Sequence, residues 1–333
     1  EKALAVYRGG LGGGKEERLN FQRKIADVLI LQGKRDQALS LLDNEILKAV
    51  PNDPIGTALR ATLWLEMGNR NQLQQAVSEL ESAVSRLPRN AVVRYNLGRA
   101  YWAKGDVDLA RAQFKAAIET QPDYIAPRLA MAQLQISRGE NAQALQSADE
   151  ILQQSRTNLG ARLLRSLALQ GMGKLDEARA ELQLILKTRP DSPEAKFRLG
   201  ILELRARNFQ AAEQVFRQCL ADGKQEPLCQ IGLAEVYNAQ QQYGKSVELL
   251  AAEVSKDPGR RELRLALANT CVLAKKYDQA MEAYKYLIAK EPESADLHMR
   301  LGETYRRSGN SGMAIEYFRR AKQLQPNNPD AAI

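Results

Sequence analysis

Apolar residues recur along the chain with the spacing of helices that each bury one face. Across residues 91–124, large apolar side chains stand three or four positions apart, around Leu97 in the first half and around Phe114 in the second. This spacing places them on one stripe of each of two helices. Gly105 separates the two stripes, and Pro122 ends the second because proline cannot continue a helix. The segment therefore predicts two helices joined by a short turn.

This pattern is a repeat with a period of 34 residues. A small residue stands at position 8 and another at position 20 of each repeat, where two closely crossing helices need it. The predicted repeats are 19–53, 54–90, 91–124, 125–158, 159–192, 193–226, 227–260, 261–294 and 295–328, of which the first carries one extra residue and the second three. Residues 1–18 predict the second helix of a truncated repeat and a glycine-rich loop, and residues 329–333 predict the start of a truncated helix.

Short motifs within the period identify a family resemblance. The runs "NLGRAY" and "RLGETY" contain L-G-x-x-Y, "ARAQFKAA" and "AIEYFRRA" contain A-x-x-x-F, and proline stands at position 32 of six repeats. In these residues the chain resembles the tetratricopeptide repeat family. The resemblance implies an all-α fold, a right-handed superhelical solenoid of about nine helix-turn-helix repeats plus half a repeat at the N-terminus. The pattern departs at Arg156 and Lys224, which replace the proline, and at Arg207, Gln241 and Lys275, which replace the turn glycine.

Composition and charge narrow the class of partner. Aromatic residues make up only 6% of the chain, and good helix formers dominate it. The net charge of +8 would permit nucleic acid or an anionic membrane as a partner. Basic and acidic residues alternate along most of the chain, however, and no basic helix carries interleaved aromatic residues. We therefore do not expect nucleic acid to be the partner, and we expect membrane association only through segments outside this chain, since no apolar run could span a bilayer.

The stretch "GGLGGGK", Gly9 to Lys15, has the spacing of a loop that binds nucleotide phosphates. That motif needs a preceding strand and a Ser or Thr after the Lys, whereas here a predicted helix precedes it and Glu16 follows it. The spacing alone is therefore weak evidence for nucleotide binding. We interpret the stretch as a flexible joint between the truncated repeat and the array.

No constellation of catalytic or metal-ligating residues is visible in the sequence. The chain has one histidine, His298, which lacks a nearby second His or Cys and is expected to lie on a surface or an interface. We expect no enzymatic activity, no cofactor and no metal. Cys219 and Cys229 fall at the ends of two consecutive predicted helices, so antiparallel packing would bring them within bonding distance, with free thiols as the alternative. Cys271 occupies a core position of its repeat and is expected to be a buried thiol.

The resemblance also implies where a partner binds. In the family, the first helices of the repeats line a concave groove through positions 2, 5, 9, 12 and 13, in which a peptide or a partner helix lies. The residues expected to bind a partner are Tyr95, Arg99, Trp102, Leu129, Gln133, Leu163, Leu167, Phe197, Ile201, Arg205, Ile231, Glu235 and Asn269. The middle of this set is more apolar than a solvated surface needs to be, which is typical of a contact surface. The alternative is that the array buries part of this stripe against its own helices.

These observations favour a non-catalytic scaffold that binds a protein partner, as a peptide or an amphipathic helix, and helps to assemble a multi-protein complex. An alternative is the regulatory or targeting arm of a larger enzyme, or of a secretion or export machine, whose active domain lies outside these residues. No small-molecule substrate is expected. The resemblance does not choose a compartment, because bacterial arrays of this appearance occur in the cytoplasm and as periplasmic or lipid-anchored proteins.

Overall fold

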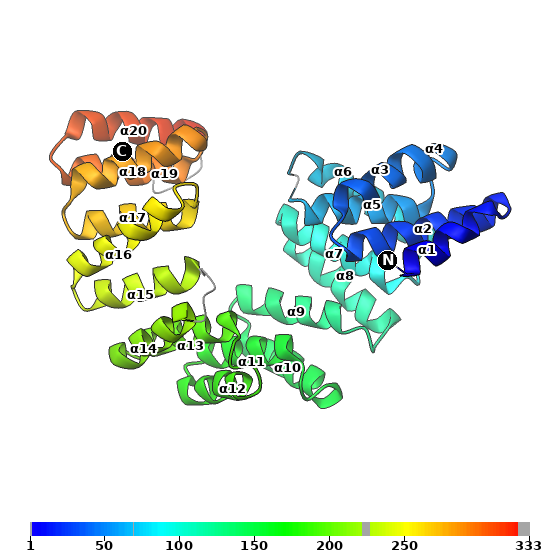
Figure 1. Cartoon of the computed structure of the whole chain (residues 1–333), viewed down its shortest axis with the longest axis horizontal. Helices are drawn as coiled ribbons and strands as arrows, with labels where there is room; N and C mark the ends of the chain where they lie inside the picture. The colour runs from blue at the N-terminus through cyan, green and yellow to red at the C-terminus, as the bar shows by residue number, and fades with distance from the viewer. Residues whose placement is uncertain (1, 69, 222–226, 326–333) are drawn as a thin grey trace. The chain divides into compact units, whose positions relative to one another are not determined.

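The computed structural model describes residues 2–68, 70–221 and 227–325, and all regular secondary structure within these ranges is helical. The chain divides into two compact bodies, Glu1–Met172 and Gly173–Ile333, which we call the N-terminal body and the C-terminal body. Within each body, successive helices pack against one another in chain order (Figure 1). The predicted all-α fold is confirmed for the described residues.

Each repeat contributes a first helix and a second helix. The first helices are α2 (Lys15–Leu31), α5 (Pro54–Glu66), α7 (Ala91–Lys104), α9 (Ile125–Ser137), α11 (Leu159–Gly171), α13 (Pro193–Arg205), α15 (Pro227–Ala239), α17 (Arg261–Leu273) and α19 (Ala295–Arg307). The second helices are α3 (Arg35–Leu41) with its continuation α4 (Leu47–Ala49), α6 (Leu73–Arg86), α8 (Val107–Thr120), α10 (Asn141–Gln154), α12 (Leu175–Thr188), α14 (Phe209–Ala221), α16 (Tyr243–Lys256), α18 (Tyr277–Lys290) and α20 (Ser311–Leu324). One further helix, α1 (Lys2–Gly9), precedes α2.

In the glycine-rich stretch, the structure contains a short helical turn, and the following helix begins earlier than the sequence predicts. Gly10–Gly12 form one turn of 3-10 helix, and α2 begins directly afterwards at Lys15 rather than at the predicted residue 19. Gly10 lies against the ring of Phe21, where a Cβ atom would collide with the ring. The missing side chain therefore lets the turn close tightly on α2. The truncated helix predicted at residues 329–333 lies outside the described residues.

The extra residues of the first two repeats are absorbed locally. In repeat 19–53, the second helix contains a π-helical turn at Leu42–Ile46, where the hydrogen-bond spacing widens to take up an additional residue. In repeat 54–90, a 3-10 turn at Arg70–Gln72 lies between the two helices. The helices on either side of each insertion keep their register, so the stack continues past it.

Every turn between the two helices of a repeat uses a residue with positive φ. Six of these residues are glycines, at Gly33, Gly68, Gly105, Gly139, Gly173 and Gly309. The other three are Arg207, Gln241 and Lys275, with φ of 61°, 60° and 58°. The next amide then donates back across the end of the helix, as from Asn208 N to Glu203 O at 2.8 Å. The three departures from the turn glycine therefore keep the same turn, although a side chain disfavours this backbone region.

Small residues are required where the two helices of a repeat cross. A Cβ atom on Gly98 of α7 would lie 2.6 Å from the ring of Phe114 on α8, which is completely buried. The residue at position 20 is equally enclosed, as Ala110 and Ala178 have no exposed surface. The large ring and the small residue therefore fit together as one packing unit.

A second recurring contact ties five of the repeats to the repeat before them. In these repeats, the side chain at position 4 of the first helix reaches the carbonyl oxygen six residues earlier, for instance from Arg128 Nε to Pro122 O at 3.2 Å. Arg94, Arg162 and Arg264 make the equivalent bond. His298 holds the same place, with Nε2 3.0 Å from Pro292 O and its ring stacked on Tyr317. The single histidine is therefore a buried packing residue between repeats.

Candidate protein-binding groove

First helices of neighbouring repeats approach each other within both bodies. α2 contacts α5, α5 contacts α7, and α9 contacts α11 in the N-terminal body. α15 contacts both α13 and α17 in the C-terminal body. The side chains that the sequence assigns to a concave face therefore lie on adjacent helices, and their exposure decides which of them could meet a partner.

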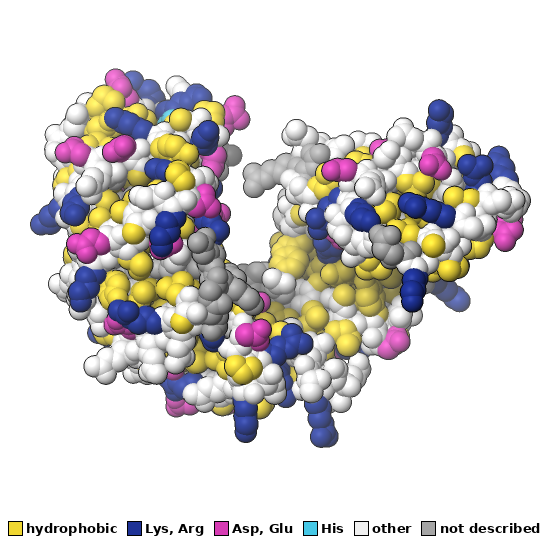
Figure 2. Space-filling model, viewed as in Figure 1, with side chains coloured by type: hydrophobic (Ala, Val, Ile, Leu, Met, Phe, Trp, Pro, Cys, Tyr) yellow, Lys and Arg dark blue, Asp and Glu magenta, His cyan; other side chains and the backbone are white. Residues whose placement is uncertain are grey.

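In the N-terminal body, five of the predicted residues line one open groove between α7 and α9. The groove has a volume of about 490 Å³. Its predicted lining residues are Tyr95, Arg99, Trp102, Leu129 and Gln133. Hydrophobic side chains gather over this part of the surface in Figure 2. The structure thus brings together residues from two consecutive repeats.

Four more residues complete the groove and were not among the predicted set. They are Leu65 from α5, Ala103 from α7, and Ala126 and Ala130 from α9. Leu65 and Ala126 occupy positions 12 and 2 of their repeats, which the family pattern already assigns to the concave face. Applying the register to repeat 54–90 despite its insertion would have found Leu65. The three alanines matter because their small side chains leave the space that forms the groove.

The wall of the groove is aromatic and continuous with the core. The rings of Tyr95 and Trp102 each lie near the buried Phe114, with centroid distances of 6.0 Å and 6.3 Å. Tyr124 meets Tyr95 edge to face at 5.6 Å. Contacts of this geometry stabilise aromatic pairs beyond their burial. The half-buried rings are therefore held in place before any partner arrives, which lowers the entropy cost of binding.

Arg99 supplies the positive charge of the groove. Its guanidinium lies 5.7 Å from the centroid of Tyr95, and Nη1 donates to Asn96 Oδ1 at 3.2 Å. Among the described residues, no carboxylate forms an ion pair with Arg99. Burial raises the pKa of Tyr124, and the charge of Arg99 partly opposes this shift. The groove therefore combines apolar walls with a cation that has a neutral partner only, an arrangement suited to an acidic group or a carbonyl oxygen.

The predicted residues of α11 differ from those of α7 and α9. Leu163 is buried, with 8% of its surface exposed, and Leu167 is only partly exposed. The expectation that Leu163 offers a contact surface is therefore wrong. Its helix packs against both α9 and α10, so the array itself covers this side chain. For Leu163, the alternative interpretation holds that the array buries this side chain against its own helices.

In the C-terminal body, the predicted apolar residues also turn largely toward the core. Phe197 and Ile201 of α13 pack against the cluster that contains Phe216, and the rings of Phe197 and Phe216 lie 6.2 Å apart. Ile231 of α15 packs against a second cluster around Leu250. These side chains retain partial exposure, but most of their surface contributes to stability.

The polar members of the set remain at the surface of the C-terminal body. Arg205 and Glu235 are exposed. Although part of the Glu235 side chain is exposed, neighbouring residues partly desolvate its carboxyl and raise its pKa, and the nearby charge of Arg205 partly lowers it. Asn269 accepts a hydrogen bond from the hydroxyl of Tyr284 at 2.6 Å and another from Arg300 at 3.4 Å. Asn269 is thus already engaged by its own helices.

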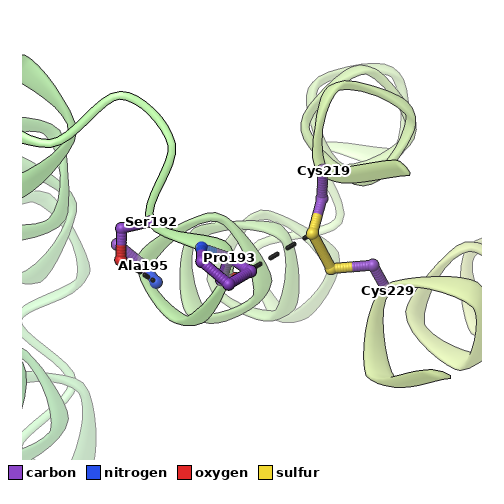
Figure 3. Close-up of a disulfide and its surroundings, with 5 residues drawn as sticks. All are labelled: Ser192, Pro193, Ala195, Cys219 and Cys229. Atoms are coloured by element: carbon purple, nitrogen blue, oxygen red, sulfur yellow. Dashed lines mark hydrogen bonds between the residues drawn. A yellow bond between two sulfur atoms is a disulfide. The ribbon is translucent and has the colours of Figure 1, made fainter. Parts of the chain in front are cut away.

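Cys219 and Cys229 are joined by a disulfide in the structure, with their Cα atoms 6.3 Å apart. Figure 3 shows the bond connecting α14 to α15, beside the start of α13, where Cys219 Sγ lies 3.9 Å from Pro193 O. Both cysteines are buried, and Cys271 is a separate buried thiol. The bond closes the connection at which Lys224 replaces the usual proline. The covalent bond therefore joins the two helices, α14 and α15, on either side of this position in the sequence.

Comparison with known proteins agrees with the repeat pattern. One tetratricopeptide repeat model matches residues 69–136, and a second matches residues 163–227 and 274–329, together more than half of the chain. The chain belongs to the tetratricopeptide repeat family. Membership of this family supports a role as a protein-interaction scaffold.

Relatives of this tetratricopeptide repeat protein include two longer eukaryotic proteins. It is 24% identical over 292 residues to a CTR9 homolog of Arabidopsis thaliana, covering 71% of this chain and 26% of that protein. It is 24% identical over 265 residues to the BBSome complex member BBS4 of Bos taurus, covering 79% of this chain and 50% of that protein. The chain thus spans between a quarter and a half of these relatives.

A solved structure supports the fold. Yeast Tom70 superposes with a TM-score of 0.65 at 12% identity, covering 98% of this chain and 88% of that chain. At this identity the likeness concerns the fold alone. Within residues 2–68, 70–221 and 227–325, no group of three acidic, His or Cys side chains is placed to hold a metal ion. Across the same residues, every helix is too short or too polar to cross a bilayer.

Proposed function

We propose that this tetratricopeptide repeat protein is a non-catalytic scaffold that holds a protein partner in the groove between α7 and α9. The observation that carries the proposal is the convergence of Tyr95, Trp102 and Leu129 around a cation, Arg99, that lacks a carboxylate partner among the described residues. Aromatic and Arg side chains are also the types that dominate binding energy at protein interfaces. The partner segment is a peptide or one face of a helix that presents an apolar side chain and a neighbouring acidic group.

The relatives support the wider role of assembly. BBS4 is by its name a member of a complex, and we extend this role to the present chain. The regulatory or targeting arm of a larger protein is a second candidate, favoured by the fact that the matched segment covers only 26% of the CTR9 homolog. Both candidate functions use the same groove to bind a partner. They differ in whether the array assembles a complex or regulates or targets a larger protein.

The test is a peptide-display selection on the wild-type chain, followed by affinity measurements on synthetic copies of the selected peptides. We expect the selected peptides to combine an apolar with an acidic residue. Trp102→Ala should lower their binding affinity roughly 10- to 100-fold, about 1.5 to 3 kcal/mol. Arg99→Glu should lower the affinity of the same peptides, and a selection on this variant should yield basic peptides instead. Leu109→Ala is the matched control, because Leu109 is an exposed apolar residue of the second helix α8, with 50% of its surface exposed.

The proposal fails if the selected peptides bind Trp102→Ala and Arg99→Glu as tightly as the parent. Loss of binding only on substitution of Arg205 or Glu235 would move the site to the C-terminal body. Circular dichroism melts of each variant exclude unfolding as the cause, since Trp102 and Arg99 are only partly buried.

A further inference from the structure

A second cavity of the N-terminal body, larger than the groove, lies between the start of α2 and the end of α4. Its volume is about 790 Å³. One wall is the beginning of α2, including Lys15, Leu19 and Gln22, and the other runs from the π-helical turn to Val50. None of the residues of the α7–α9 groove takes part in it. The two cavities are therefore separate places on the same body.

Both walls arise from irregularities of repeat 19–53. The first helix carries an additional turn because α2 begins at Lys15, and this turn extends the wall beyond the usual start of a repeat. The opposite wall contains the π-helical turn Leu42–Ile46, which displaces the end of the second helix. π-Helical turns occur frequently at functional sites. Among the described residues, no other repeat contains a π-helical turn or a first helix that begins before its repeat.

Three apolar residues lie among the residues that line this cavity. Leu19 and Val50 are partly buried and face it with Ala49. Gln22 and Glu45 also line it: Gln22 Nε2 donates to Glu45 Oε2 at 2.7 Å, and Gln22 is buried, with 5% of its surface exposed. Water bound over Leu19 and Val50 would be released by an apolar side chain placed there.

The rim is cationic. Lys15, Arg18 and Lys48 are exposed and line the cavity, and none of them forms an ion pair with any described residue. Two carboxylates, Glu16 and Glu45, also line the cavity, and Glu45 keeps its charge because its partner Gln22 is neutral. Three cations therefore face two anions, and the net positive charge favours a ligand with carboxylates over a basic one.

We propose that this cavity is a second binding site, which takes a short acidic peptide segment with an apolar side chain. The apolar side chain lies against Leu19 and Val50, and carboxylates lie beside Arg18 and Lys48. Glu16 and Glu17 occupy the first turn of α2, so the carboxylates bind on the Lys48 side of the cavity rather than at the helix end. A scaffold with two peptide sites in one body can hold one partner by two segments and gain avidity.

The test uses the whole chain, labelled with nitrogen-15, and the peptide acetyl-Glu-Leu-Leu-Glu-amide. We expect this peptide to shift the amide resonances of Gln22 and Lys48 and to leave the Trp102 indole unchanged. The matched peptide acetyl-Lys-Leu-Leu-Lys-amide should produce no shifts at these amides. Lys48→Glu should weaken the acidic peptide at least roughly tenfold, whereas Lys115→Glu, an equal charge reversal on α8, should not.

A cavity-filling variant separates shape from charge. Ala49 is exposed, so Ala49→Trp is expected to fold normally and to abolish binding by occupying the space. Equal binding of both peptides, or full binding by Lys48→Glu or Ala49→Trp, would overturn the proposal. Absence of any shift at peptide concentrations of about 10 mM, or shifts confined to Trp102, would overturn it as well.

Discussion

The two bodies use the same repeat positions in different ways. In the N-terminal body, positions 5, 9 and 12 of repeat 91–124 carry Tyr95, Arg99 and Trp102, which stay partly exposed around an open groove. In the C-terminal body, positions 5 and 9 of α13 carry Phe197 and Ile201, which are also partly exposed and pack against the core around Phe216, but an apolar side chain there replaces the cation Arg99. The comparison teaches that a repeat position defines where a side chain points, and the residue type at that position decides what it can bind.

The connections differ between the bodies too. In the N-terminal body, glycines take the left-handed conformation at all four turns between paired helices. In the C-terminal body, three consecutive turns place Arg207, Gln241 and Lys275 in that conformation, and a disulfide links α14 to α15. A side chain in this backbone region costs about 1 to 2 kcal/mol. The C-terminal body therefore combines strained turns with a covalent restraint.

Loss of the disulfide is expected to give the largest effect. The bond joins residues ten apart in sequence, and closing a loop of this length stabilises the folded state by about 2 to 3 kcal/mol. Cys229→Ser, or reduction of the wild type, should lower stability by this amount, as measured by urea unfolding. Binding of peptides to the α7–α9 groove should not change, because the groove lies in the other body. Cys271→Ser serves as the control for loss of a thiol, and an unchanged midpoint for Cys229→Ser would contradict the prediction.

Exchanging the turn residues tests the second contrast. Arg207→Gly should raise stability by about 1 kcal/mol, because glycine adopts a positive φ without a side-chain clash. Gly139→Arg in the N-terminal body should lower it by a similar or larger amount. Both are measured by thermal unfolding against the parent. A destabilising Arg207→Gly would show that the side chain of Arg207 makes a compensating contact.

The contact at position 4 offers a finer comparison. His298→Ala should cost about 1 kcal/mol through loss of the bond to Pro292 and the stack on Tyr317, and Arg128→Ala in the N-terminal body should cost about as much. His298→Arg should restore most of the stability, because arginine makes this bond in other repeats. Urea midpoints of the three variants provide the measurement. An equal loss of stability in His298→Arg and His298→Ala would show that the histidine ring itself is required.

The smallest effect concerns the charge at Glu235. Desolvation raises its pKa, so the folded state binds the proton more tightly than the unfolded state, and the charged carboxylate opposes folding at higher pH. Glu235→Gln should therefore melt slightly above the parent at about pH 7, and the difference should fade as the pH drops to about 4 and the parent takes up its proton. A variant that melts below the parent at neutral pH would show that the attraction to Arg205 outweighs desolvation.

Some features of the candidate sites could be read from the chain and others could not. Tyr95, Arg99, Trp102, Leu129 and Gln133 were predicted from their positions in the repeat, and they line one groove. Leu163 satisfied the same rule and is buried. The rule describes one helix at a time, whereas the exposure of Leu163 depends on how closely α11 approaches α9 and α10.

The second cavity shows a similar limit. The sequence predicts one extra residue in repeat 19–53 and a loose glycine-rich joint before it. It does not indicate that the insertion becomes a π-helical turn, or that the glycines close into a tight turn and start α2 early. These outcomes follow from packing against Phe21 and the rest of the repeat, which no local pattern expresses.

The sequence by itself determined the period, the two helices of each repeat, the small residues where they cross and the place of each turn. These features depend on spacings of a few residues, which local backbone geometry translates directly into helices and turns. Only the tertiary structure decided which concave side chains remain open, that Arg99 has no carboxylate partner among the described residues, and that Cys219 and Cys229 meet. Those properties depend on distances between helices of different repeats, and such distances are set by packing of the whole stack.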